Sequence, residues 1–255
     1  AIVDLNRFVF EGFGIDPAKV IVVADEPLLV DHLVVPERLA QLNHSADPSL
    51  RWVYDAIARR PEGTAPSRRL YISRRVFNAT FSRRVIANEI RVENLFRQAG
   101  FEIFYPELVS FAEQVATCSQ AAVIAGMSGS NLLNVHFAAR DALLIEIGDP
   151  RYQGKPNPCL PPAAGVARAR HRFIPFVGRV FGPRMTVLVD IDHLTEAVEP
   201  ILREDLAQGG DRLALSRPAF KASDMAEVCY RCVRPTAGYL ARVLARGLRG
   251  GPMPA

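Results

Sequence analysis

Short apolar runs alternate with segments of helical periodicity between residues 70 and 147, and no other feature constrains the fold as strongly. The clearest helix is expected over residues 88–99, where Val92, Leu95 and Phe96 recur at the spacing of one helix face. Strands that alternate with helices at such intervals indicate βαβ units, a parallel sheet and right-handed crossovers. We therefore expect an α/β fold, with strands at 70–73, 101–104, 121–125 and 142–147 and further helices from 110 and from 131 to about 139. Gly100 is expected to end the helix at 88–99, and Ser110 with Glu113 predicts a capping box at the start of the next.

The chain has three parts of different character. Residues 61–67 contain Pro61 and Pro66 around a glycine and predict a linker, so we place a boundary after residue 60. The expected parts are a short N-terminal part at 1–60, a domain at 61–203 and a helical tail at 204–255. Smaller expected elements are a strand at 20–23, an extended piece at 28–35, partly helical residues at 37–60, a long loop at 150–170, edge strands at 172–175 and 185–189, and a helix at 192–202.

The composition excludes several classes of protein. Hydrophobic residues make up 49% of the 255 residues, too many for a disordered chain. No run of about 18 apolar residues is present to span a membrane. The formal net charge of +4 counts against a nucleic-acid-binding protein. Cys229 and Cys232 have the spacing of half a zinc site, but no second pair accompanies them, so we expect ordinary reduced cysteines, no metal and a cytoplasmic location.

The basic residues are nearly all arginine, since only three of the 31 are lysine. Arginine presents forked donors that suit phosphate, although a genome rich in arginine codons explains the count equally well. Position is more informative: Arg74 and Arg75 follow the strand at 70–73, and Arg83 and Arg84 come soon after. Two such arginines can hold a diphosphate bidentately, and the alternative is a solvated basic loop.

A glycine turn at residues 126–131 follows a buried strand and precedes a helix. At the carboxyl ends of parallel strands, a helix N-terminus offers free N–H groups and a favourable dipole to a phosphate. Gly126 and Gly129 let the backbone approach a ligand closely, and Ser128 or Ser130 can donate a hydroxyl. The alternative is a tight turn capped by Ser130. Because Arg74 is expected at the same sheet edge, the two features together predict a nucleoside-diphosphate ligand.

Five blocks of the chain resemble, in order and spacing, the family 61 glycosyltransferases, and the likeness extends over about residues 20–203. That family includes plant xylan-decorating enzymes, the O-GlcNAc transferase that acts on EGF domains, and bacterial capsule and lipopolysaccharide enzymes. The blocks are Tyr71-Ile-Ser-Arg-Arg75, Arg83-Arg-Val-Ile-Ala-Asn-Glu89, Gly100-Phe-Glu-Ile103, Leu108-Val-Ser-Phe-Ala-Glu-Gln114 and Gly126-Met-Ser-Gly-Ser-Asn-Leu-Leu-Asn134.

The resemblance implies a GT-B architecture, in which two Rossmann-like halves hold a nucleotide sugar in their cleft. Residues 61–203 would be the Rossmann-like nucleotide-sugar-binding half, and residues 1–60 the end of the acceptor-side half. It also implies an inverting, metal-independent transfer from a nucleoside-diphosphate sugar, UDP-linked and without a further cofactor, to a glycan or lipid-linked glycan acceptor in bacterial surface polysaccharide synthesis. The donor-binding residues expected from the residues and the resemblance together are Arg74, Arg84, Asn88, Gly126, Ser128, Gly129, Ser130, Asn131 and Glu146.

Two departures from the family pattern support an alternative. The family loop usually reads Gly-Pro-His-Gly-Ala-Gly-Leu-Thr-Asn, whereas this chain has Ser128 in place of the histidine and Asn131 in place of a glycine. In addition, residues 1–60 are short for an acceptor-side half, and the chain starts at Ala1, so we expect it to be part of a longer protein. The alternative function is a catalytically degenerate nucleotide-sugar-binding or scaffolding module.

The roles of the remaining polar residues stay open at this point. Glu146, late in the strand at 142–147, is expected to reach a ribose hydroxyl or to pair with a nearby arginine. His136, inside the helix, is expected to be a packed or surface residue. The arginines of the tail either contact an anionic membrane surface, at the inner face of the membrane, or form a solvated helix end. No catalytic base is assigned.

Overall fold

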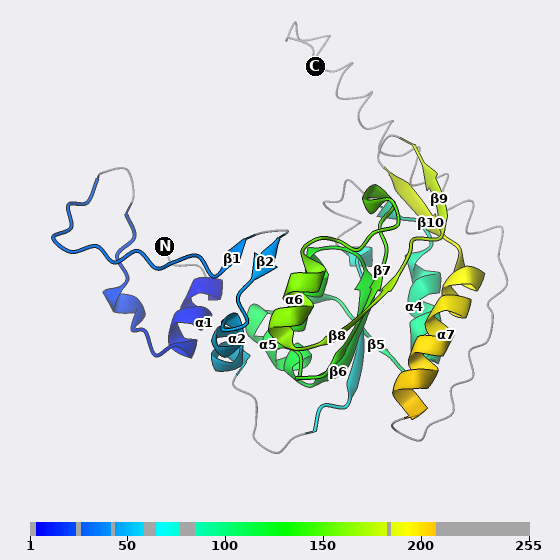
Figure 1. The fold of residues 1–255 in the computed structure, drawn as a ribbon, viewed down its shortest axis with the longest axis horizontal. Helices are drawn as coiled ribbons and strands as arrows, with labels where there is room; N and C mark the ends of the chain where they lie inside the picture. Colours follow the sequence, from blue (N-terminus) through cyan, green and yellow to red (C-terminus); the bar gives the residue numbers. More distant parts are fainter. Residues whose placement is uncertain are drawn as a thin grey trace, which may run out of the picture. The chain divides into compact units, whose positions relative to one another are not determined.

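The computed structural model describes residues 4–23, 27–41, 44–58, 65–76, 85–182 and 185–207 (Figure 1). The chain divides into two compact units. The first unit comprises residues 1–72 and 101–175, and the second comprises residues 73–100 and 176–255. Arg83, Arg84, Cys229, Cys232 and the arginines of the tail lie outside the described residues. The boundary expected after residue 60 stays a prediction.

The first unit contains a five-stranded parallel sheet, which confirms the predicted α/β fold with a Rossmann-like sheet. The central strands carry apolar side chains on both faces, as is typical of parallel sheets, and these side chains are buried. The expected edge strand near residue 172 is the last strand of this sheet. In spatial order the strands are β5 (Glu102–Phe104), β3 (Arg68–Ile72), β6 (Ala121–Met127), β7 (Leu143–Ile147) and β8 (Arg170–Ile174).

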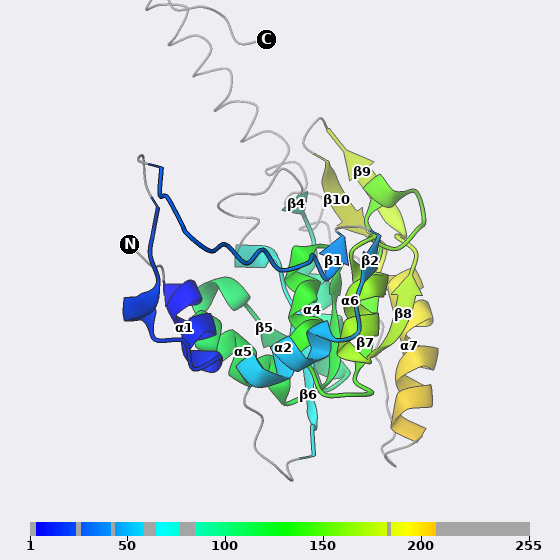
Figure 2. The ribbon, with the colours of Figure 1, turned by 60° about the vertical axis from the view of Figure 1, so that its left-hand side comes forward.

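Helices cover one face of this sheet and share one apolar core with it (Figures 1 and 2). Ile72, Ile124 and Leu144 of the strands pack in the same cluster as Leu132 and Leu160 of the helices. Ser110 and Glu113 form the predicted capping box. The helices are α1 (Asp4–Gly12), α2 (Leu50–Ala58), α5 (Phe111–Ser119), η3 (Ser130–Phe137) and α6 (Leu160–Ala167), with the short turns η1 (Pro17–Lys19), η2 (Pro106–Leu108) and η4 (Pro150–Tyr152).

Two expectations for the first unit are wrong, those for residues 150–170 and 20–23. The loop expected at 150–170 contains α6, which begins at Leu160 and has Pro161 and Pro162 in its first turn. Proline fits there because the first N–H groups of a helix have no partner within it. The helix expected after the glycine turn is present and is a 3₁₀ helix. The strand expected at 20–23 does not form: its described residues pair with no neighbouring strand, and a strand needs a partner.

The apolar residues from Ile21 to Val35 are exposed where the structure describes them, and the side chain of Leu29 is 94% exposed. A short hairpin follows these residues in sequence and is formed by β1 (Ala40–Gln41) and β2 (Ser45–Ala46). Among the described helices, none is both long and apolar enough to cross a membrane.

The second unit contains a three-stranded sheet and two long helices. Its central strand β10 (Thr186–Val189) runs parallel to β4 (Val85–Ile86) and antiparallel to β9 (Gly178–Phe181). The expectation that residues 185–189 form an edge strand is therefore wrong, and β9 was not expected. Helix α4 (Glu89–Gln98) packs against α7 (Ile191–Ala207), and both bury apolar side chains. Gly100, with a φ of 76°, follows α4 as predicted.

Candidate functional site

The strand order of the five-stranded sheet reverses between β3 and β6. The next strand of the sheet in sequence, β5, lies on one side of β3, whereas β6, β7 and β8 follow one another on its other side. In open parallel sheets, ligands bind at the carboxyl ends of the strands at such a switch point. The register pairs Ile72, the last residue of β3, with Gly126, so the glycine turn begins at this switch point.

Gly126 lies where β6 runs closest to its neighbour. A Cβ atom at this position would stand 2.9 Å from the carbonyl oxygen of Ile72 and 3.0 Å from Cδ2 of Leu132. No real Cβ atom approaches a backbone oxygen this closely without a shift of the chain, so glycine permits the tight start of the turn. Two residues later, the N–H of Ser128 donates to the carbonyl oxygen of Ile147 at 2.7 Å, and Ser128 is fully buried. The turn is thus held by backbone contacts on both sides of β6.

The helix η3 starts directly after this turn. Its N-cap is Gly129 and no side chain caps it, so the interpretation of Ser130 as a helix cap is wrong. Ser130, the first helical residue, is exposed, and the amide of Asn131 donates to the carbonyl oxygen of Ile72 at 3.5 Å. The first N–H groups of a helix have no acceptor within it, and they carry the positive end of its dipole. The backbone here has the features of an anion site.

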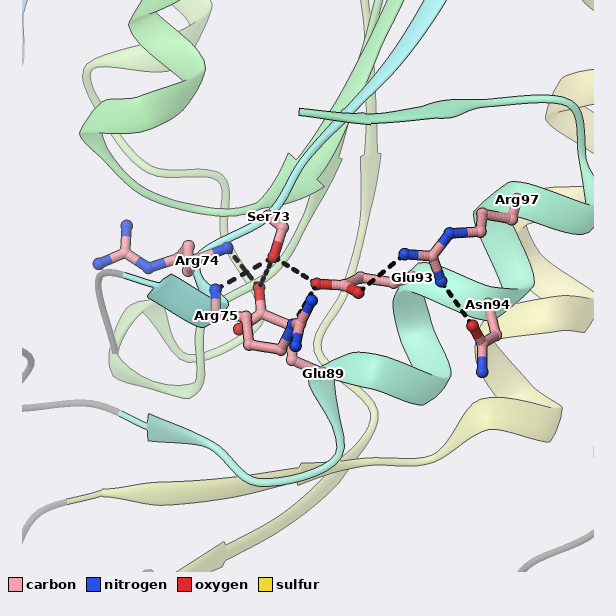
Figure 3. A network of polar contacts seen from close by, with 7 residues as sticks. All are labelled: Ser73, Arg74, Arg75, Glu89, Glu93, Asn94 and Arg97. Carbon is pink, nitrogen blue, oxygen red and sulfur yellow. Dashed lines mark hydrogen bonds and ion pairs between the residues drawn. The ribbon is translucent and has the colours of Figure 1, made fainter. Parts of the chain in front are cut away.

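A network of buried carboxylates holds the residues that follow β3 in sequence (Figure 3). Ser73 Oγ donates to Glu93 Oε1 at 2.8 Å and accepts the N–H of Arg75 at 3.0 Å. Oε1 of Glu89 accepts the backbone N–H of Arg74. Glu93 also accepts from Arg75 Nε at 2.9 Å and from Arg97 at 3.3 Å. Arg74 itself is half-buried, and its guanidinium points away from both carboxylates (Figure 3).

The two glutamates are in different electrostatic situations. Both are buried, with 2% of Glu89 and none of Glu93 exposed. Glu93 pairs with two guanidinium groups, those of Arg75 and Arg97. Burial raises the pKa of Glu89 to about 7, and the negative charge of Glu93 acts in the same direction. The backbone hydrogen bond and the charge of Arg74 oppose this shift without cancelling it. Glu89 therefore titrates near neutral pH.

Asn88, expected in the donor site, makes a two-point clamp within the second unit. Its Nδ2 donates to the carbonyl oxygen of Val189 at 2.8 Å, and its Oδ1 accepts the N–H of Val189 at 3.0 Å. The side chain is buried, with 2% exposed. Asn88 thus fixes the end of β10 to the start of α4. Its predicted contact with the donor stays untested by this geometry.

Glu146 lies fully buried in β7, and both of its oxygens accept hydrogen bonds within the first unit. Oε1 accepts the N–H of Asn157 at 2.8 Å, and Oε2 lies 3.0 Å from Nε2 of His171. The partner is a histidine and a backbone amide rather than the arginine that we considered. These two bonds hold the carboxylate inside the protein. The contact with a ribose hydroxyl stays a prediction.

His136, on η3, is a packed residue. Its ring stacks on Tyr54 with centroids 4.1 Å apart and planes at 4°. Within the described part of the chain, its buried Nδ1 has no hydrogen-bond partner. Burial lowers the pKa of His136 to about 4, and the nearby charge of Arg51 adds to this effect. The ring is consequently neutral at neutral pH.

The second unit also contains an open cavity of about 550 Å³ beside the end of β10 and the start of α7. Asp190 accepts the N–H of His193 at 3.2 Å and pairs with its ring at 3.1 Å. The side chains of Arg179 and Asp192 have no partner among the described residues. The polar and aromatic groups that line the cavity are Arg91, Arg179, Phe181, Asp190, Asp192 and His193. Across the described ranges, no three acidic, histidine or cysteine side chains are grouped so as to hold a metal ion.

Sequence reasoning did not identify Ser73 or Glu93 as members of this network. A signal was present, because Glu89 and Glu93 fall on the same helix face as Val92 and Phe96, at positions i, i+3, i+4 and i+7. Carboxylates within an apolar stripe are buried when the helix packs, and buried carboxylates need partners. The clamp between Asn88 and Val189 had no such signal, since 101 residues separate the two.

The comparisons with known proteins agree with the resemblance. The model of the glycosyltransferase 61 family matches residues 2–145, which is more than half of the chain. This range includes β3, the carboxylate network of α4 and the whole glycine turn. No curated protein matches the chain.

Proposed function

This chain belongs to the glycosyltransferase 61 family and is a glycosyltransferase, and from that premise we propose that it uses a nucleoside-diphosphate sugar, UDP-linked, as donor. We further propose that the acceptor is a glycan or lipid-linked glycan of a bacterial surface polysaccharide and that transfer inverts the anomeric configuration without a metal ion.

The observation that carries this proposal is the glycine turn at the switch point of the parallel sheet. Strand order, the close approach at Gly126 and the start of η3 coincide there. A diphosphate is the part of the donor that such a backbone site suits, because it is anionic and accepts several N–H hydrogen bonds. Arg74, two residues after β3, stays a proposed donor-binding residue because a guanidinium suits a diphosphate.

The proposed reaction is a single displacement. An acceptor hydroxyl oxygen forms a bond to the anomeric carbon, while the bond from that carbon to the diphosphate oxygen breaks. The hydroxyl proton passes to a general base, which we leave unassigned, and the nucleoside diphosphate leaves with the electron pair. Negative charge therefore grows on the leaving group, and the N–H groups of the turn stabilise it most in the transition state.

The cavity of the second unit is our proposed site for the acceptor glycan. Sugar hydroxyls both donate and accept, so they need acceptors such as Asp192 and donors such as Arg179, and the ring of Phe181 offers an apolar face to sugar C–H groups. We expect Arg179→Ala and Asp192→Asn to raise the KM for a soluble oligosaccharide acceptor about tenfold each, as for one lost charged hydrogen bond. Both variants should leave the affinity for UDP unchanged. Unchanged acceptor kinetics would remove the cavity from the proposal.

Titration calorimetry with UDP and other nucleoside diphosphates tests the donor site. We expect Arg74→Ala to weaken UDP binding about 10- to 100-fold, since a charged hydrogen bond contributes about 1.5–3 kcal/mol. Arg203→Ala is the matched control, because Arg203 lies exposed on α7 and pairs only with Glu199 in the described part of the chain. Equal affinity of wild type and Arg74→Ala would contradict the assignment of Arg74.

A binding or scaffolding module without turnover is the second candidate, favoured by Ser128 in place of the family histidine. A serine donates a neutral hydrogen bond and cannot carry the positive charge of a histidine. Release of UDP from a UDP-sugar, measured over hours with and without acceptor, separates the two functions. Turnover supports the enzyme, whereas tight binding without turnover supports the module.

We also propose that the protein works in the cytoplasm at the inner face of the membrane. The support is the family resemblance to polysaccharide enzymes and the arginine-rich tail of the sequence. Co-flotation with vesicles that contain anionic lipid, compared with neutral vesicles, tests the membrane contact.

A further inference from the structure

Within the first unit, helix α2 packs against η3, whose N-terminus follows the glycine turn. Arg51 and Tyr54 lie three residues apart and so share one face of α2. Nη2 of Arg51 donates to the carbonyl oxygen of Ala138, the C-cap of η3, at 3.2 Å. The ring of Tyr54 stacks on that of His136, in the last turn of η3, with centroids 4.1 Å apart. Both contacts hold the end of η3 that lies opposite the glycine turn.

The guanidinium of Arg51 joins the C-terminal ends of two helices. Arg51 is buried, with 3% exposed, and each of its three side-chain nitrogens donates a hydrogen bond. Nε donates to Oδ1 of Asp55 at 2.9 Å, and Nη1 donates to the carbonyl oxygen of Ala167, the last residue of α6. Asp55 also accepts from Arg140, which follows η3 in sequence, at 3.2 Å. Arg51 thus fixes η3 to both α2 and α6.

The two ends of η3 need opposite partners. The last carbonyl groups of a helix have no donor within it and carry the negative end of its dipole, so a guanidinium suits them. The first N–H groups carry the positive end and suit an anion. A 3₁₀ helix has poorer hydrogen-bond geometry than an α-helix, and η3 has only eight residues. Contacts from outside η3 are therefore needed to keep its N–H groups in one direction.

We propose that Arg51 and Tyr54 are positioning residues for the diphosphate site, and that nucleotide binding is coupled to the docking of α2 on η3. This inference rests on the proposed donor site at the glycine turn. When α2 separates from η3, the first N–H groups of η3 lose their fixed direction, and the affinity for the diphosphate falls. By linkage, a ligand that binds the docked state more tightly stabilises docking by the same factor. Residues 1–60, which include α2, then serve the donor site.

Titration calorimetry with UDP, on variants of the whole chain, tests the positioning. Arg51→Lys keeps the charge, but its compact ammonium group cannot reach three separate acceptors as the guanidinium fork does. We expect this variant and Tyr54→Leu, which loses the ring stack, each to weaken UDP binding about fivefold or more. Tyr54→Phe keeps the stacked ring and should bind like wild type. So should Trp52→Ala, the matched control, because Trp52 is 69% exposed on another face of α2 and contacts Phe13.

Hydrogen exchange measures the same coupling in the wild-type protein, so it does not depend on a variant that folds. Saturating UDP should slow the exchange of the α2 amides about fivefold, the factor by which undocking weakens binding. The slowing should be smaller in Tyr54→Leu. Thermal unfolding of each variant shows whether it is folded at the temperature of the titration. A role in stability alone would lower the melting temperature and leave the UDP affinity of the folded variants unchanged.

The outcomes distinguish this inference from the donor proposal. If wild type binds no nucleoside diphosphate, both are overturned. If wild type binds UDP, and Arg51→Lys and Tyr54→Leu bind it equally well, the inference alone is overturned. The same follows if saturating UDP leaves the exchange of the α2 amides unchanged. Weakening by Trp52→Ala as large as that by Tyr54→Leu would also overturn the inference, since the effect would not depend on the contacts with η3.

Discussion

Each compact unit has, among its described residues, an ionisable side chain that burial makes harder to charge, and the two side chains are of opposite type. In the first unit it is His136, a base whose pKa burial lowers to about 4. In the second it is Glu89, an acid whose pKa burial raises to about 7. The physical cause is the same, since a buried site disfavours the charged form of either group. The difference teaches that the same cause, burial, assisted by a neighbouring charge in each case, makes His136 and Glu89 respond to pH in opposite directions.

The largest expected effect concerns Glu89 and the free energy of unfolding. The folded pKa lies above the unfolded one of about 4.5, so this contribution is fully present below pH 4.5 and is lost as the pH rises through 7. The shift corresponds to about 3 kcal/mol. Urea unfolding from pH 4.5 to 8.5 should therefore show a loss in wild type that is absent in Glu89→Gln. Parallel curves for the two proteins would show that Glu89 has an ordinary pKa.

A somewhat smaller effect of opposite sign is expected from His136. Its folded pKa lies below the unfolded value, so its contribution is fully present above pH 6.5 and is lost as the pH falls through 4. We expect a loss of about 2 kcal/mol, because the ring is only partly shielded from solvent. His136→Phe, which preserves the stack on Tyr54, should flatten this acid limb in urea unfolding. His44→Gln, at an exposed histidine of the same unit, is the control and should leave the limb unchanged.

The glycine turn is built from backbone groups, whereas the carboxylate network is built from side chains. Gly126→Ala should lower the free energy of unfolding by about 2 kcal/mol, since the added Cβ meets the carbonyl oxygen of Ile72 at 2.9 Å and overpacks the sheet. It should also weaken UDP binding, because the glycine turn is the proposed diphosphate site. Gly154→Ala, on a surface turn with open space around it, offers a control for glycine replacement, although its φ of 79° adds a strain of its own. Retention of full stability by Gly126→Ala would show that β3 and β6 can separate there.

The smallest effect is expected at Ser130. Because no side chain caps η3, Ser130→Ala should change the free energy of unfolding by less than about 0.5 kcal/mol, as at an ordinary surface position. A true helix cap would lose about 1 kcal/mol. Chemical denaturation of the variant separates these values, and a loss of 1 kcal/mol would restore the cap. A change in UDP affinity without a change in stability would assign the hydroxyl to the ligand.

Local patterns predicted most of the first unit and the helix α4 of the second. The helix at 88–99, the capping box at Ser110 and the strands on either side of them were within reach because each depends on residues a few positions apart. The failures have a physical reason as well. Helix α6 was not predicted, because the prolines in its first turn are also typical of loops. The apolar residues 20–23 have strand-forming side chains, but no strand lies beside them in the described part of the chain.

In the candidate site, too, the local features were predicted and the contacts between distant segments were not. The sequence alone identified the glycine turn, Arg74 and the helix that carries Glu89, because short motifs and helical periodicity are local properties. Only the tertiary structure decided the strand order that puts Ile72 beside Gly126, the clamp of Asn88 on Val189, and the meeting of Ser73 with Glu93. These depend on which distant segments come together. The same burial sets the protonation of Glu89, since its pKa reflects the surroundings that packing creates rather than the residue type.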